Sequence, residues 1–394
     1  MNGFNQYTPT EVIFGKGTEN QVGETAKKWG GSRILIVYGG GSVVRSGLLD
    51  RVKASLDAAG LAWEEFGGAR PNPYLNHAEE GVQKAIAFGA DLILAVGGGS
   101  TIDTAKGIAH GTANPDTKLW DIWTKKVPLT KTLPVGVVLT IAAAGSEMSD
   151  SAVLTNTETG VKAGLGTEFN RAKFAIMNPE LTFTLPDYQI ACGVTDIMMH
   201  TMERYFIPGA QEMLTDEIAE GLLRTVIANG RLALKDKTDV NALGEIMWCS
   251  SLSHNGLTGA GRSARDFSVH KFGHALSVKY DVAHGASLSA VWKAWAEYAC
   301  EGEGALERFA RFARKVWLVE EEDDRAACAK GIEMTVAYFK EIGVATCLKD
   351  FGLDPSEEEI QDLAMKTTSN DTVRLCPART ITAVEAKAIF EASR

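Results

Sequence analysis

The sequence predicts an α/β amino-terminal domain with a parallel sheet, followed by an all-helical carboxy-terminal domain. In the first half, short apolar runs rich in β-branched residues alternate with helical stretches, which is typical of βαβ units. After Pro186 only three of the eleven prolines remain, and Ala, Leu, Glu, Lys and Met recur at helical periodicity. The turn MNPELTFTLPD disfavours helix before each of its prolines, Pro179 and Pro186. We therefore expect domains at residues 1–186 and 187–394.

Three strands of the sheet are predicted from these apolar runs. They are RILIVY at 33–38, DLILAV at 91–96 and LPVGVVL at 133–139. Glycine-rich segments follow the first two directly: YGGGSVVRSG at 38–47 and GGGSTIDTAKG at 97–107. Each reads as a strand, a tight loop and a helix start.

Such loops let backbone N–H groups approach a phosphate closely, and the helix N-terminus adds partial positive charge. Either loop alone could be a plain turn. Two of them at the carboxyl ends of parallel strands, where α/β sheets place ligands, favour a nucleotide and a Rossmann-like sheet. Neither matches GxGxxG with an acidic residue about 20 positions on, so the usual dinucleotide fingerprint is missing.

Composition limits the class of partner. The chain has 394 residues, 45% of them hydrophobic, with net charge −10 and a pI near 5.3. The acidic balance disfavours nucleic acid and anionic membranes as partners. The start MNGFNQYTPTEVIFG lacks signal-peptide features, and no apolar run is long enough to span a membrane, so we expect a soluble cytoplasmic protein. Six cysteines without CxxC spacing indicate reduced packing residues rather than disulfides or ligands.

Five polar residues of the second domain have the spacing of metal ligands. Asp196 and His200 lie one helical turn apart, and His270, His274 and His284 fall within fifteen residues of a chain with only seven histidines. A carboxylate with imidazoles and no thiolate suits Fe(II) or Zn(II). A DxxxH pair alone is common in solvated helices. Spacing also leaves open whether His270 or His274 binds, because they too are one turn apart.

These motifs together resemble the iron-containing, or group III, alcohol dehydrogenases, which share a dehydroquinate synthase-like architecture. The resemblance rests on GGGSTIDTAK, TIAAAGSEMS at 140–149, the Asp196/His200 pair and HxxxHx9H, and it runs from EVIFGKG at 11–17 to CPARTITAVEAKAIFEAS at 376–393. YGGGSVVRSG, PNPYLNHAEEGV and DIMMHTMERYF look most like the butanol dehydrogenase and broad-substrate NADPH aldehyde reductase branch. One departure is AAAGSE at 142–147, where many members read GTGSE, so the contacts of that loop are in doubt.

The resemblance implies roles for individual residues. His274 corresponds to a non-ligand histidine beside the nicotinamide and is a candidate proton relay, although packing alone could hold it. The implied metal ligands are Asp196, His200, His270 and His284. The implied cofactor contacts are Gly39, Gly40, Gly41, Ser42, Asn72, Gly97, Gly98, Gly99, Ser100, Asp103, Thr140, Lys162 and Leu181.

The choice between NADP(H) and NAD(H) depends on Gly39. Members of the family that prefer NAD often carry an Asp at this position, whose carboxylate binds the ribose 2′-hydroxyl and repels a 2′-phosphate. With glycine at this position, hydrogen-bond donors from Gly40 to Ser42 and positive charge from Arg45, the site should accept NADP(H).

The expected function is a metal-dependent NADP(H) alcohol dehydrogenase, or aldehyde reductase, that interconverts short- to medium-chain aldehydes such as butanal and primary alcohols by hydride transfer. A homodimer is expected, paired through the 11–17 segment. Broad specificity is expected, because one methylene is worth only about 1–3 kcal/mol of discrimination. Candidate pocket residues, any of which could instead be core, are Met148, Ser149, Asn156, Met198, Met199, His254 and Phe267.

Two alternatives belong to other classes. A lyase of the dehydroquinate synthase type would need several basic residues around a phosphorylated substrate, and the sequence has no such cluster near the metal motifs. A structural zinc brace would also use four protein ligands, but it fits poorly with two phosphate loops and no thiolates.

Overall fold

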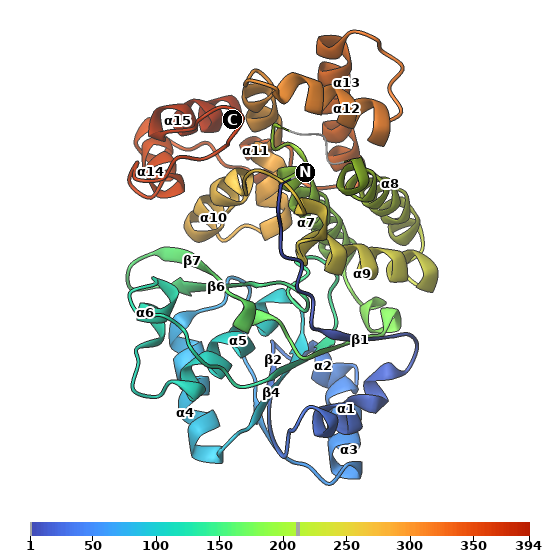
Figure 1. The fold of residues 1–394 in the computed structure, drawn as a ribbon, viewed down its shortest axis with the longest axis vertical. Helices are drawn as coiled ribbons and strands as arrows, with labels where there is room; N and C mark the ends of the chain where they lie inside the picture. Colours follow the sequence, from blue (N-terminus) through green and yellow to red (C-terminus); the bar gives the residue numbers. More distant parts are fainter. Residues whose placement is uncertain (1, 210–212) are drawn as a thin grey trace. The chain divides into compact units, whose positions relative to one another are not determined.

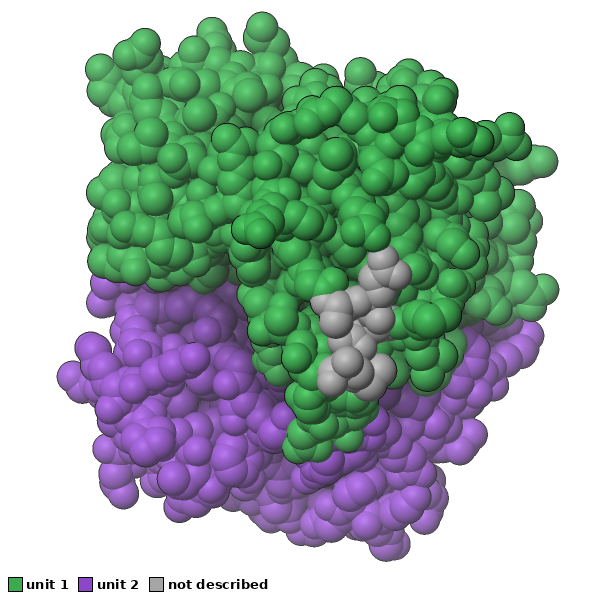
Figure 2. Space-filling model, turned by 45° about the horizontal axis from the view of Figure 1, so that its top comes forward, with its two compact units in different colours: residues 1–6, 185–394 green, residues 7–184 purple. Residues whose placement is uncertain are grey.

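The structure is a computed structural model that describes residues 2–209 and 213–394. The chain forms two compact units, coloured separately in Figure 2. Residues 7–184 make up the sheet unit, and the described residues of 1–6 and 185–394 make up the helical unit. The long segment of the helical unit begins at Leu185, one residue before Pro186, where the first predicted domain ends.

The sheet unit is built on six parallel strands in the order β1-β8-β5-β4-β2-β3 (Figure 1). The strands are β1 (Glu11–Phe14), β2 (Arg33–Tyr38), β3 (Ala62–Phe66), β4 (Leu92–Gly97), β5 (Val135–Leu139) and β8 (Phe174–Met177). The helices of this unit are α1 (Val22–Lys28), α2 (Ser42–Arg45), α3 (Leu48–Ala58), α4 (Leu75–Phe88), α5 (Gly99–Ala113) and α6 (Leu119–Trp123).

Both faces of the sheet are buried, which explains why its strands are apolar runs rather than alternating sequences. Ile34, Ile36 and Leu94 pack with the inner faces of α1 and α3 in one core cluster. Leu35 and Ile93 point to the opposite face and are equally buried; α4 and α5 lie on that side (Figure 1). A sheet covered on both sides by helices is the predicted fold of this part of the chain, and it is confirmed.

The predicted strands differ from the observed ones at their ends. The strand expected at 33–38 is found unchanged, and the one at 91–96 is shifted by one residue. The strand expected at 133–139 begins two residues later, at Val135, because Pro134 has no N–H to donate, although its carbonyl accepts a hydrogen bond from Ile93. An antiparallel hairpin of β6 (Ser151–Asn156) and β7 (Val161–Gly166) was not predicted.

The strand order places the two glycine loops at a topological switch point. β2 and β4 are neighbours in the sheet, but β2 leads on to β3 on one side and β4 leads on to β5 on the other. The loops after these two strands therefore leave the same edge of the sheet in opposite directions. In open α/β sheets, ligands bind in the crevice that such diverging loops create.

The helical unit consists of nine named helices among the described residues. They are α7 (Asp187–Tyr205), α8 (Met213–Lys235), α9 (Val240–His254), α10 (Ser268–Tyr280), α11 (His284–Ala299), α12 (Ala305–Val316), α13 (Asp324–Glu341), α14 (Glu357–Thr367) and α15 (Ala383–Ala392). In the part of this unit that is described, strand-like pairing is limited to one bridge, Leu375 with Ile381. The prediction of a helical second half is confirmed. None of the described helices has the length and apolarity needed to cross a bilayer.

Helix α7 is the centre of this unit. It packs against α8, α9 and α11, and 14 of its 19 residues are buried. Polar residues on such a helix face protein rather than water, so each needs a partner. Asp196, His200 and Glu203 are among the buried residues of α7, and they begin the candidate metal site.

Candidate active site

The first two metal-ligand candidates, Asp196 and His200, lie one turn apart on α7, as the sequence predicted. Their side chains are 4% and 5% exposed, and Oδ1 of Asp196 lies 3.5 Å from Nδ1 of His200. A carboxylate this deeply buried is costly unless a cation compensates it. We therefore expect a positive charge beside the Asp196 carboxylate.

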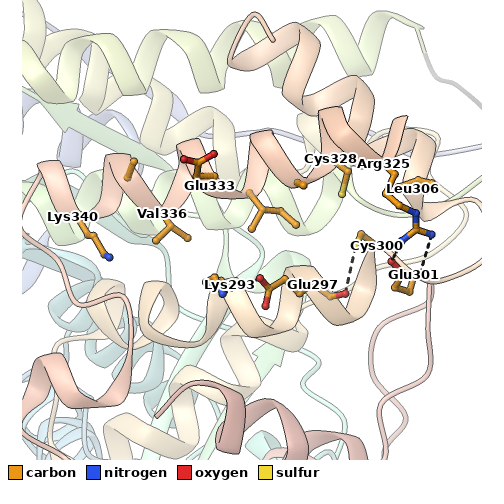
Figure 3. Close-up of a pocket in the computed structure, with 13 residues that line it drawn as sticks. Lys293, Glu297, Cys300, Glu301, Leu306, Arg325, Cys328, Glu333, Val336 and Lys340 are labelled. Atoms are coloured by element: carbon orange, nitrogen blue, oxygen red, sulfur yellow. Dashed lines mark hydrogen bonds and ion pairs between the residues drawn. The ribbon is translucent and has the colours of Figure 1, made fainter. Parts of the chain in front are cut away.

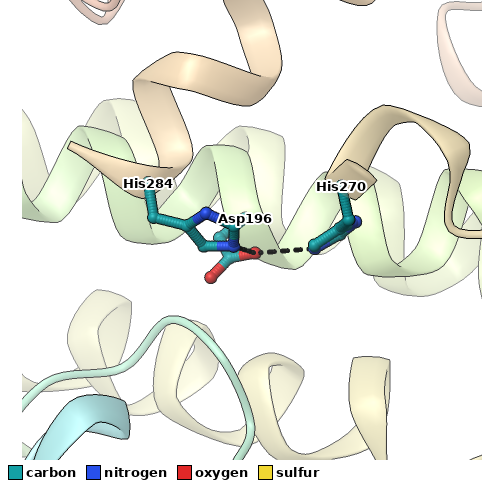
Figure 4. Close-up of side chains that lie close together, drawn as sticks. All are labelled: Asp196, His270 and His284. Carbon is teal, nitrogen blue, oxygen red and sulfur yellow. Dashed lines mark ion pairs between the residues drawn. The ribbon is translucent and has the colours of Figure 1, made fainter. Parts of the chain in front are cut away.

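Two further imidazoles reach the same carboxylate oxygen from other helices. Nε2 of His270 on α10 lies 3.4 Å from Oδ1 of Asp196, and Nε2 of His284 lies 3.9 Å from it. Each of the three residues offers a donor atom within 4.8 Å of the others, and Figure 4 shows the carboxylate between the two rings. Of the two histidines that spacing could not separate, His270 is in this group and His274 is not.

His284 is the first residue of α11, and its side chain is 30% exposed, whereas His270 is 7% exposed. The cluster is therefore buried on one side and open to solvent on the other. Catalytic metal sites keep a position for substrate, and closed structural sites do not.

The fourth expected ligand, His200, sits beside this group rather than within it. Its ring stacks on His270 at 4.5 Å between centroids, with an interplanar angle of 22°. Nδ1 of His200 and Nε2 of His270 are buried and have no hydrogen-bond partner within residues 2–209 and 213–394. Buried polar atoms of this kind need an explanation. One carboxylate and several imidazole nitrogens, without a thiolate, form a donor set that fits Fe(II) or Zn(II).

The sequence reasoning missed Glu203, which positions His270. Its carboxylate accepts a hydrogen bond from the backbone N–H of His270 at 3.2 Å, and a second, short one joins Oε2 to Nδ1 of the ring. This bond turns Nε2 of His270 toward Asp196, as a carboxylate behind a ligating histidine does in metal sites. Glu203 follows Asp196 by seven residues and His200 by three, so DxxxHxxE carried a signal for it.

The two stacked imidazoles have opposite pKa shifts. Burial alone would lower the pKa of His270, but the carboxylates of Glu203 and Asp196 outweigh it and raise that pKa to about 9. Burial lowers the pKa of His200 well below its ordinary value, and the neighbouring His254 and His270 add to the effect. The shift favours the protonated form of His270, whose positive charge lies beside the carboxylates of Glu203 and Asp196. A bound divalent cation would take over that charge.

The proton-relay candidate, His274, lies near this cluster. It is half-buried on α10, and its ring centroid is 5.4 Å from that of His284 and 6.4 Å from that of His270. Its predicted role is not tested by these contacts and stays a prediction.

The glycine loops of the sheet unit are held by close packing. A Cβ atom on Gly97 would lie 2.5 Å from Oγ1 of Thr101, and one on Gly98 would lie 3.0 Å from Ile141. Gly41 has φ of 99°, a conformation that favours glycine, directly before α2 begins at Ser42. Gly40, Gly99 and Ser100 complete the two loops, with α5 starting at Gly99. These loops bring backbone N–H groups to the edge of the sheet where β2 and β4 end.

The carboxylate of Asp103 is bound to neighbouring protein groups. It accepts hydrogen bonds from Oγ of Ser146 at 2.7 Å and from the backbone N–H of Val153 at 2.9 Å. Lys106, which the sequence reasoning did not single out, donates to both oxygens of Ser146 and to the carbonyl of Ser151 at 2.7–2.8 Å. Burial lowers the pKa of Lys106 to about 8, against the opposing charge of Asp103. These contacts fix the 142–147 segment to α5.

The other predicted cofactor residues have different surroundings. Nζ of Lys162 donates to Oδ1 of Asn72 at 3.0 Å, so these two residues, distant in sequence, are neighbours. The backbone N–H of Thr140 donates to the carbonyl of Gly97 at 3.1 Å, which places Thr140 beside the second glycine loop. Leu181 packs against the apolar core beneath α1 and α3. Whether these residues contact a cofactor stays a prediction.

Several candidate pocket residues are deeply packed. Met198 and Met199 are fully buried on α7, and Asn156 accepts backbone hydrogen bonds that shape the turn between β6 and β7. His254 and Phe267 lie beside the candidate metal ligands. The ring centroid of His254 is 4.0 Å from that of His200, and the ring centroid of Phe267 is 5.5 Å from that of His270. Met148 and Ser149 are also buried.

The chain matches two family models in succession. Residues 9–179 match the iron-containing alcohol dehydrogenase model, and residues 190–393 match the carboxy-terminal model of the Fe-containing alcohol dehydrogenase family. The chain belongs to the iron-containing alcohol dehydrogenase family. This alcohol dehydrogenase is therefore an oxidoreductase, and its family implies a divalent metal and a nicotinamide cofactor.

Curated relatives cover the whole of this alcohol dehydrogenase. It is 38% identical over 394 residues to NADH-dependent butanol dehydrogenase A of Clostridium acetobutylicum, with both chains covered completely. It is 34% identical over 397 residues to the NADPH-dependent aldehyde reductase YqhD of Escherichia coli, again over the full length of both. Among solved structures, NADH-dependent butanol dehydrogenase A of Thermotoga maritima superposes with a TM-score of 0.94 at 34% identity, covering 100% and 99% of the two chains. The predicted family and branch are confirmed.

Proposed function

We propose that this alcohol dehydrogenase reduces short- to medium-chain aldehydes to primary alcohols with NADPH, and catalyses the reverse reaction with NADP. A divalent ion, Fe(II) or Zn(II), would be held by Asp196, His200, His270 and His284. One observation carries the proposal: donor atoms of Asp196, His270 and His284 converge within 4.8 Å, and the cluster is open to solvent at His284.

The ion, when bound, supplies a Lewis acid that polarises the aldehyde carbonyl and stabilises the negative charge that develops on its oxygen. Asp196 would offset one of the two positive charges of the ion. Glu203 keeps the ring of His270 oriented by accepting its Nδ1 hydrogen bond. His274, half-buried near His284, is suited to pass a proton between the alcohol oxygen and solvent.

The sheet unit would bind the cofactor through its two glycine loops. Glycine at position 39 places no carboxylate at the end of β2, where an acidic side chain would bind the 2′-hydroxyl of NAD and repel the 2′-phosphate of NADP. Arg45 is exposed at the end of α2 and offers charge to a phosphate. Relatives are named as NADH-dependent and as NADPH-dependent, so the preference for NADP(H) rests on Gly39.

The substrate class follows from the relatives' names and from the pocket candidates. The relatives from Clostridium acetobutylicum and Escherichia coli are named as a butanol dehydrogenase and as an aldehyde reductase. His254 and Phe267 offer an aromatic surface beside the metal ligands, which suits an apolar alkyl chain. We also propose a homodimer formed through β1, which is an edge strand of the sheet.

The test follows oxidation of NADPH by butanal with protein stripped of metal and then reloaded with Fe(II) or Zn(II). Turnover should require the metal, be abolished in His270→Ala, and be faster with NADPH than with NADH. A His77→Ala variant, altered on α4 and outside the unit that carries the proposed ligands, should keep its activity. Metal-independent turnover, or full activity of His270→Ala, would contradict the proposed metal site. Absence of turnover with every aldehyde and metal would contradict the proposed function.

A further inference from the structure

A second group of reactive side chains lies in the helical unit, in a pocket that the proposed reaction does not use. The pocket encloses about 450 Å³ and is lined by residues of α11, α12 and α13 with the turn that follows α11 (Figure 3). Cys300 and Cys328 both line it. Glu297, Glu301 and Arg325 also line this pocket.

The two cysteines belong to different segments of the helical unit and line the same pocket. Cys300 directly follows the last residue of α11, and Cys328 lies in the second turn of α13, which packs against α11. Both side chains line the pocket at the same end (Figure 3), and both are free thiols. Cys300 also donates from Sγ to the carbonyl of Glu297 at 3.4 Å. A disulfide between these thiols would join the end of α11 to α13, and these two helices pack against each other.

An ion pair lies beside the thiols. The guanidinium of Arg325 binds both oxygens of the Glu301 carboxylate, at 2.6 and 3.3 Å. Figure 3 shows this pair at the same end of the pocket as the two cysteines. The neighbouring Cys328 thiol lowers the pKa of Cys300 against the effect of burial, and Arg325 adds to the lowering. Cys300 in turn raises the pKa of Cys328.

The remaining thiols differ from this pair. Burial raises the pKa of Cys249 and of Cys376 to about 12, and that of Cys192 to about 11. Cys300 is the cysteine whose pKa is lowered, and the thiolate is the form that reacts with oxidants. It also lines a cavity far larger than the roughly 30 Å³ that one water occupies. A molecule as small as hydrogen peroxide therefore fits beside it.

We propose that Cys300 and Cys328 are a redox-active thiol pair that hydrogen peroxide converts into a disulfide between the end of α11 and α13. The Cys300 thiolate attacks the peroxide, the O–O bond breaks, and Cys300 becomes a sulfenic acid while one water leaves. The Cys328 thiol then attacks that sulfur, the S–O bond breaks, and a second water leaves as the S–S bond forms. Two thiols lose two hydrogens and one peroxide is reduced. A dithiol reverses the reaction.

The test uses the zinc-loaded full-length enzyme, reduced and freed of reductant, with about one equivalent of hydrogen peroxide. The number of free thiols, measured after denaturation, should fall by two and recover with dithiothreitol. Peptide mapping without reduction should give one cross-linked pair, containing Cys300 and Cys328. This result on the unmodified chain does not depend on whether any variant folds.

Variants separate the two roles. In Cys328→Ser, a dimedone probe should label Cys300 and no disulfide should form. In Cys300→Ser, neither product should appear. Cys347→Ser, at the half-buried cysteine before residues 348–351, is the matched control and should form the disulfide as the parent does. A cross-link between other cysteines, or no loss of thiols while Cys300 stays unlabelled, would overturn the proposal. These chemical readouts are independent of aldehyde reduction.

Discussion

The hydrogen bonds that His270 donates to Glu203 predict a loss of metal affinity in Glu203→Gln. The carboxylate accepts from both the backbone N–H and the ring Nδ1 of His270, whereas an amide of the same shape can accept at only one of its two ends. One N–H of His270 would then face an NH₂ group, and the ring would lose the contact that turns Nε2 toward Asp196. Loss of a residue that hydrogen-bonds to a metal ligand lowers metal affinity by about 10–100-fold. This corresponds to about 1.4–2.7 kcal/mol of binding free energy.

The assay is competition for Zn(II) or Fe(II) between the protein and a chromophoric chelator. Glu220→Gln is the matched control, because Glu220 is also a fully buried carboxylate of the helical unit but binds Tyr205 and Arg311 instead. Both variants should lose stability as metal-free proteins, and only Glu203→Gln should lose metal affinity. Equal metal affinity in Glu203→Gln and the parent enzyme would refute the reasoning, provided that thermal unfolding shows both to be folded.

Two further predictions concern the sheet unit. Gly39→Asp should shift the ratio of KM for NADPH to KM for NADH upward by about tenfold, or about 1.4 kcal/mol, because it adds a carboxylate at the end of β2; an unchanged ratio in a folded variant would contradict the proposed cofactor site. Burial lowers the pKa of His110 from 6.5 to about 4, so between these values the unfolded chain binds more protons and stability falls as pH decreases. Denaturant titration of the metal-free protein measures its free energy of unfolding at pH 7.5 and at pH 5.5. Between these two pH values the parent should lose about 1 kcal/mol more of this free energy than His110→Gln. Equal losses in the two proteins would exclude this role for His110.

The sequence predicted those features that have a regular period or a fixed spacing. Strands buried on both faces must be continuous apolar runs, so β2 and β4 were recognisable within one residue, and the glycines after them marked the loops. The spacing of Asp196 and His200 fixed their common helix face. His270 and His274 share the same spacing, so only the packing of α10 against its neighbours separates the one beside Asp196 from the other.

The missed features depend on tertiary contacts. The β6–β7 hairpin consists of a small two-stranded sheet whose second strand, VKAGLG, is rich in small residues and mostly not buried, so it lacks the apolar signal of the main sheet. Glu203 and Lys106 are charged residues in helices, where charge usually indicates a solvated face. Their burial follows from partners distant in sequence, the ring of His270 and the backbone at Ser146 and Ser151.

The candidate metal ligands come from three separate helices, and this has a thermodynamic consequence. α7, α10 and α11 converge on one carboxylate oxygen, so an ion held there would connect segments far apart along the chain. Anything that binds only the folded state adds to its stability, by about 2.7 kcal/mol when its free concentration is 100 times its Kd. The folded population of the helical unit would then follow the supply of metal in its surroundings. Under metal limitation the amount of folded enzyme, and not only its turnover, would decline.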